Sequence, residues 1–191
     1  YNKLKRTYEA GTRLIAEIKD EIMYLESIIN AIDIATTEND LNNIKDELAV
    51  TGYIKRSGKS KSKGNTHNKP MHYVSSDGFD IYVGKNNIQN DELTFKFATG
   101  GDWWFHAKQM PGSHVIVKTE GKELPDKTFE EAAALAAYYS KGRDLEKVEV
   151  DYVLKKEVKK PAGAKPGFVV YYTNYSLIAI ADISGIRLIS G

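Results

Sequence analysis

The chain has 191 residues, enough for one domain with a sizeable core and an appendage. A formal net charge of +1 excludes a global field that draws it onto nucleic acid or membrane, so such binding must rest on local charge clusters. Cysteine is absent, which excludes disulfides, thiolate metal sites and a cysteine nucleophile and fits a reducing compartment. No apolar run approaches the ~18 residues of a membrane span and no signal peptide is recognisable, so we expect a cytoplasmic protein without membrane contact.

Residues 1–35 show the clearest periodicity. Apolar side chains recur at alternating spacings of four and three, the a/d seam of a coiled coil, interrupted only at Gly11. The seam consists of Leu4, Tyr8, Ile15, Ile18, Ile22, Leu25, Ile29 and Ile32. One helix cannot bury such a seam, so we expect a partner helix, either upstream in the same protein or from a second chain. The alternative is a long amphipathic helix that packs on its own domain. The missing cap before the pattern suggests the C-terminal part of a longer coiled coil.

A shorter helix and a basic segment are predicted next. Thr37 and Asp40 form a capping arrangement and Gly52 suits a C-terminal cap, so residues 1–51 are expected to be a helical coiled-coil arm. The segment 52–70 is interpreted as a basic flexible linker, either simply solvated or touching phosphates. Between residues 55 and 69 it contains no acid and has Lys or Arg at positions 55, 56, 59, 61, 63 and 69.

Residues 71–191 are predicted to form an α+β domain with a mainly antiparallel sheet and two packed helices. Asp77-Gly78 lies between two β-rich runs and indicates a hairpin turn in which both residues need positive φ. Asn86 is expected to cap one helix, and Thr128 to Glu131 has the pattern of a capping box before an alanine-rich helix. Further strands are expected at 148–154, 168–172 and 176–181.

The stretch 101–115 contains both tryptophans and two of the four histidines. Strand alternation places Trp103 and Phe105 on one side and Asp102, Trp104 and His106 on the other. Pro111-Gly112 suits the centre of a type II turn, and a strand at 114–118 should bring Ser113 and His114 near His106.

A catalytic site in this stretch is not expected. Asp102 and His106 are two pleats apart, roughly 13 Å along a strand, which is too far for a hydrogen bond. His106 and His114 offer two metal ligands, but no spacing supplies a third. We therefore predict no enzyme activity, no metal and no cofactor.

Two interpretations remain for the stretch. Its aromatic and polar groups either pack in the core and bond to turns, or form a binding face in which rings stack on unpaired bases and lysines hold phosphates. In the second case Trp104, His106 and Lys108 lie beside the Pro-Gly turn. A separate basic loop would join them, with Lys155, Lys156, Lys159, Lys160 and Lys165.

Residues 102–108 and 111–115 resemble the Asp-x-Trp-x-His-Ala…Pro-Gly-Ser-His-Val signature of the NFACT-R domain. Further matches lie at 75–78, 83–87, 90–91, 130–140 and 160–167, so the resemblance covers about residues 72–181 in the family's order. Trp103 stands where the family usually has an aliphatic residue, and we expect only local repacking from it. The preceding helices resemble the end of the family's middle coiled-coil region. The chain thus looks like the C-terminal part of a bacterial RqcH-type protein, also called fibronectin-binding protein A-like.

The resemblance implies a factor of ribosome-associated quality control. Such proteins bind stalled large ribosomal subunits with peptidyl-tRNA and recruit alanyl-tRNA for alanine tailing, while the ribosome performs the peptide-bond chemistry. The implied partners are the large subunit and tRNA or rRNA. The alternatives are an adhesin that binds fibronectin and a purely structural or interaction domain. The positions transferred by motif are Asp102, Trp104, His106, Pro111, Gly112, Ser113 and His114.

Overall fold

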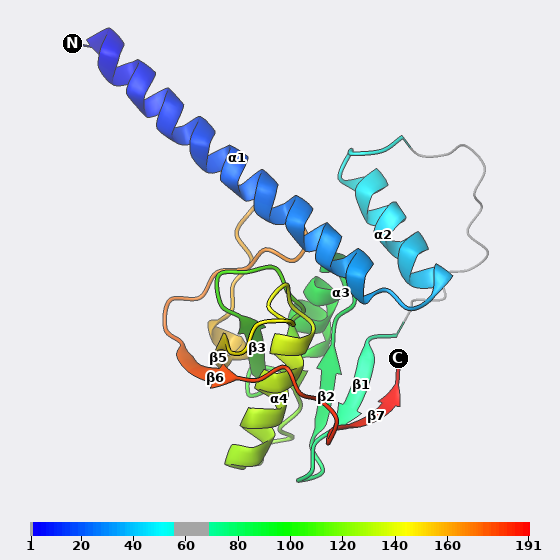
Figure 1. Ribbon diagram of the computed structural model, residues 1–191. Helices are drawn as coiled ribbons and strands as arrows, with labels where there is room; N and C mark the ends of the chain where they lie inside the picture. Colours follow the sequence, from blue (N-terminus) through cyan, green and yellow to red (C-terminus); the bar gives the residue numbers. More distant parts are fainter. Residues whose placement is uncertain (1, 56–68) are drawn as a thin grey trace.

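The computed structural model describes residues 2–55 and 69–191, so most of the proposed linker at 52–70 lies outside the described residues. The chain begins with two helices, α1 (Asn2–Ile34) and α2 (Glu38–Val50). The capping box at the start of α2 is confirmed: the Thr37 hydroxyl accepts from the Asp40 amide, and the Asp40 carboxylate accepts from the Thr37 amide. The first half of α1 projects away from the rest of the molecule (Figure 1).

The heptad seam of α1 does not pack on its own domain. From Leu4, 77% exposed, to Ile32, 46% exposed, every apolar seam residue keeps a large accessible surface. Helix α1 is instead buried along a different face, through Tyr24, Ile28 and Ala31, which pack against Ile44 of α2. The interpretation of α1 as a helix that hides its seam within this chain is therefore wrong.

Seven strands form one antiparallel sheet in the order β6-β5-β3-β4-β2-β1-β7. Their bounds are β1 Met71–Val74, β2 Asp80–Val83, β3 Trp103–Ala107, β4 Val115–Val117, β5 Val148–Leu154, β6 Tyr175–Ala179 and β7 Arg187–Ser190. The central strands bury residues on both faces, and β4 is buried at all three positions, so the sheet has two apolar faces that each need a cover.

Helix α4 (Asp126–Tyr138) covers one face, and its run of alanines permits close approach to the strands. Helix α3 (Asn87–Glu92), capped by Asn86, continues into a π-helical segment, η1 (Leu93–Phe97), and packs on the other face. Phe105 belongs to the α4 core and Trp104 to the core beneath η1, so the predicted alternation along β3 is confirmed. The predicted α+β fold with two packed helices is confirmed as well.

Two local predictions, one of a helix cap and one of a strand, are wrong. Thr128 and Glu131 do not cap α4, which begins at Asp126 after Pro125; their side chains bond to Ser75, Ser76 and Asp77 of the β1–β2 hairpin instead. The range 168–172 contains a single bridge, from Val170 to Lys159, and no strand.

The turn chemistry also differs from expectation. The β1–β2 hairpin forms, but only Gly78 has a positive φ, 86°, because the loop closes through a bond from the Gly78 amide to the Ser75 carbonyl. Gly112 does not have the positive φ of a type II turn; Gln109, with φ 54°, bends the chain after β3.

Candidate functional site

A groove of about 900 Å³ lies between α1 and the globular domain. The aromatic motif contributes Trp104, His106 and His114 to its lining, and the Pro-Gly corner contributes Pro111 and Gly112. The opposite sides come from residues 17–27 of α1 and from the loop 161–167. The structure thus brings two of the sequence matches, the motif and the Pro-Gly-rich loop, into one site.

Asp102 organises the turn before β3 and is not available to a ligand. Its side chain is 1% exposed, and its carboxylate accepts from the amides of Thr99 at 2.7 Å and Thr119 at 3.1 Å. The Lys118 ammonium donates to it at 2.5 Å. Burial alone would raise the pKa of Asp102, but these bonds outweigh burial and hold the pKa below its usual value.

Trp104 is buried rather than offered as a stacking platform. It is 1% exposed, and its ring packs against His106 at 5.5 Å, Tyr171 at 5.2 Å and His114 at 5.1 Å between centroids. Stacking of a base on Trp104 would require these rings to separate. The expected approach of His114 to His106 is observed, with centroids 5.5 Å apart.

The remaining motif residues fix the corner between β3 and β4. The buried Ser113 hydroxyl donates to the Gly84 carbonyl at 2.6 Å, and the Nδ1 of His114 lies 2.8 Å from the Thr94 hydroxyl. A Cβ on Gly112 would meet the Cβ of Ser140 at 3.0 Å, so the backbones approach too closely for a larger residue.

Burial favours the neutral form of both histidines. Burial lowers the pKa of His106, although a backbone bond at Gly112 opposes the shift. Burial, followed by the charge of His106, lowers the pKa of His114 well below its ordinary value. Among the described residues, no cluster of three His, Asp or Glu side chains is arranged to hold a metal ion.

The candidate lysines divide into two groups. Lys108 pairs with Glu149, Lys160 with Asp91 and Lys165 with Glu21, so these three ammonium groups are already neutralised within the fold. Lys160 and Lys165 hold the loop 161–167 against α3 and α1. Within residues 2–55 and 69–191, the side chains of Lys155, Lys156 and Lys159 form no ion pair.

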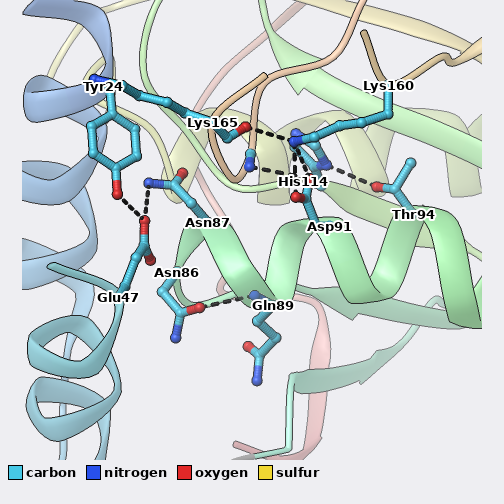
Figure 2. Close-up of polar contacts among 11 residues, drawn as sticks. Tyr24, Glu47, Asn86, Asn87, Gln89, Asp91, Thr94, His114, Lys160 and Lys165 are labelled. Carbon is cyan, nitrogen blue, oxygen red and sulfur yellow. Dashed lines mark hydrogen bonds and ion pairs between the residues drawn. The ribbon is translucent and has the colours of Figure 1, made fainter. Parts of the chain in front are cut away.

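A buried polar cluster, which the sequence did not reveal, joins the helical arm to the domain (Figure 2). Glu47 of α2 is 0% exposed and accepts from the Tyr24 hydroxyl at 2.9 Å and from the Asn87 amide group at 3.0 Å. Burial raises the pKa of Glu47 despite these bonds. Nearby, Lys85 and Asp40 form a buried ion pair at 3.4 Å. In the sequence, Asp40 was assigned to helix capping, and Lys85 and Asn87 lay within a family match, but nothing placed them together.

Residues 69–173 match the NFACT protein RNA binding domain, and residues 1–67 match the NFACT N-terminal and middle domains. The chain belongs to the NFACT family. It is 46% identical over 172 residues to the Rqc2 homolog RqcH of Streptococcus suis, which covers 90% of this chain and 30% of that protein. Its identity to the Rqc2 homolog RqcH of Bacillus subtilis is 38% over 184 residues, or 95% of this chain and 32% of that protein. The chain therefore spans about a third of the length of these relatives.

A solved structure supports the same NFACT assignment. The C-terminal part of the fibronectin/fibrinogen-binding protein from Streptococcus suis has a TM-score of 0.86 and 44% identity to this chain, and the match covers 95% of this chain and 72% of that one. The resemblance inferred from the motifs is thus confirmed. Among the described residues of this NFACT chain, no helix is long and apolar enough to span a membrane.

Proposed function

We propose that this chain is the RNA- and ribosome-binding module of a ribosome-associated quality-control factor. Its NFACT RNA-binding domain and its similarity to proteins named Rqc2 homolog RqcH support this function. The observation that carries the proposal is the unpaired set Lys155, Lys156 and Lys159: these ammonium groups meet no carboxylate in the described structure, so phosphates can neutralise them.

In this proposal the buried motif is a scaffold and the chain is not an enzyme. Asp102, Trp104, Ser113 and His114 fix the strands, while the lysines contact the large ribosomal subunit through tRNA or rRNA. The whole protein acts in the cytoplasm on stalled subunits that hold peptidyl-tRNA and promotes alanine tailing there. The exposed seam of α1 binds an upstream helix of the same protein or a helix of a second chain.

Titration of the chain with fluorescent tRNA and with a large-subunit rRNA fragment, each at two salt concentrations, tests the proposal. We expect saturable binding of at least one RNA that weakens steeply with salt, because each neutralised phosphate releases counterions. Absence of binding, or binding independent of salt, would contradict it.

A second candidate function is suggested by the solved relative whose name is fibronectin/fibrinogen-binding protein. The same preparation should then bind immobilised fibronectin saturably, and soluble fibronectin should compete. Saturable fibronectin binding together with a failure to bind either RNA would favour this adhesin function over the RNA-binding function.

A further inference from the structure

Phe97 is an exposed aromatic in the segment that runs beside the lysine-rich loop, whereas Trp104 is buried. Phe97 ends the π-helical segment η1 and is 44% exposed, whereas Trp104 is 1% exposed. Short π-helical segments are energetically poor and occur often at functional sites. Phe97 contacts Tyr82, which packs against the apolar cluster that contains Trp104.

The backbone places two of the unpaired lysines next to this segment. The Lys155 amide donates to the Asp102 carbonyl at 2.8 Å, and the Lys156 amide donates to the Gly100 carbonyl at 3.3 Å. The Lys155 ammonium lies 5.8 Å from the ring centroid of Phe95. The residues that follow η1 therefore run directly beside the start of the lysine-rich loop.

The ring of Phe97 is supported from below and from one side. Tyr82 of β2 meets Phe97 edge to face at 4.7 Å, and His72 of β1 stacks on Tyr82 at 4.5 Å. The Lys118 ammonium lies 5.0 Å from the Phe97 centroid while it donates to Asp102. Phe97 thus has packed neighbours while 44% of it stays exposed, so it should lose less side-chain entropy on binding than an unsupported side chain.

We propose that Phe97 is a stacking site for an unpaired base of single-stranded RNA, whose adjacent phosphates contact Lys155 and Lys156. An exposed aromatic ring beside unpaired lysines has the chemistry of sequence-tolerant single-strand binding: the ring offers a π-face and the ammonium groups follow the backbone. The groove suits phosphates less well, since Lys165 is paired there and α1 adds Glu17 and Asp20. This inference rests on the proposed RNA-binding function and names the chemistry of its ligand.

The test compares a short single-stranded oligoadenylate with a blunt RNA duplex of the same length, by fluorescence anisotropy. Phe97→Leu keeps apolar volume against Tyr82 but removes the ring. It should weaken binding of the single strand about 5- to 150-fold and leave duplex binding unchanged, because duplex bases are already stacked. Phe97→Tyr keeps a ring and should bind like the wild type. Tyr8→Leu, at a more exposed aromatic on α1, is the control and should change neither affinity.

The two proposals fail in different ways. If the wild type binds RNA with a steep salt dependence but Phe97→Leu binds the single strand equally well, the stacking site is wrong and the RNA-binding function stands. An equal loss for strand and duplex also refutes stacking. If the wild type binds neither RNA, both proposals fall. Should Phe97→Leu not fold, a loss of single-strand affinity in Phe97→Tyr would overturn the site.

Discussion

The simultaneous replacement of Lys155, Lys156 and Lys159 by alanine tests which charges contact RNA. None of the three is tied to a carboxylate in the described structure, so their removal leaves no buried group unpaired. Stability should change only within ~0.5 kcal/mol per site, as for surface substitutions in general. Any loss of RNA affinity then reports lost contacts rather than unfolding.

The magnitude follows from counterion release. If each lysine neutralises one phosphate, the slope of log K against log salt falls by about 2.1 for a single strand, which is ~0.7 for each of three contacts. Between ~50 and ~200 mM salt, the affinity gap between wild type and variant should therefore narrow about 20-fold. Anisotropy titrations at about four or more salt concentrations within this range measure the slope for the wild type and the slope for the variant.

A control with the same change of net charge separates contact from general attraction. Lys3, Lys19 and Lys45 are exposed on the arm helices, and their joint replacement by alanine removes three charges that lie outside the lysine-rich loop. The screening length falls from ~14 to ~7 Å over this range of salt, so we expect little change of slope. Equal slope changes in the two triple variants would refute the assignment of the contacts.

Three further predictions concern stability. Asp102→Asn should lower the free energy of unfolding by ~2–4 kcal/mol, measured by denaturant titration, because it removes charge-assisted bonds in a buried turn. Burial raises the pKa of Glu47 above its usual 4.5, so the wild type should lose stability as pH rises through that shifted pKa. Glu47→Gln should remove this dependence of stability on pH. The prediction is contradicted if the melting temperatures of the two proteins change with pH in the same way. Lys85→Met removes the buried cation that pairs with Asp40 and should lower the free energy of unfolding by ~3–5 kcal/mol. An unchanged melting temperature would refute a stabilising role for this pair.

Local signals predicted most elements of the fold. Thr37 and Asn86 accept from the helix amides as their sequence context indicates, and the two periodicities gave the long helix and the alternation along β3. Such features depend on a few neighbouring residues, so a single sequence is enough to read them.

The errors share a different cause, which is competition from distant parts of the chain. Thr128 and Glu131 have the right spacing for a cap, but the β1–β2 hairpin offers their side chains partners from more than 50 residues away. Residues 168–172 have β propensity, yet they pair only once because the backbone leads out of the loop 161–167. Propensity cannot weigh partners that only the tertiary fold supplies.

The candidate site shows the same limit in its most important feature. Alternation correctly assigned Trp104 and His106 to one face, but it could not show that α3, η1 and Tyr171 cover that face. Pairing likewise depends on the fold: Asp91 and Glu21 are remote in sequence from Lys160 and Lys165. The sequence could therefore identify which residues are unusual, but not which of them remain free for a ligand.

The buried motif and the exposed lysines are consequences of one arrangement. Asp102 binds Lys118 and Thr119 beyond β4, and its carbonyl accepts from the Lys155 amide, so one residue fixes both the turn before β3 and the start of the lysine-rich loop. Phe97 lies over Lys118, which joins the aromatic ring to the same network. A substitution at Asp102 should then weaken RNA binding only through displacement of these groups, and in proportion to lost stability. Substitution of Phe97 or Lys156 should weaken RNA binding without lowering the stability of the fold. This contrast distinguishes a residue that positions the surface from one that contacts RNA.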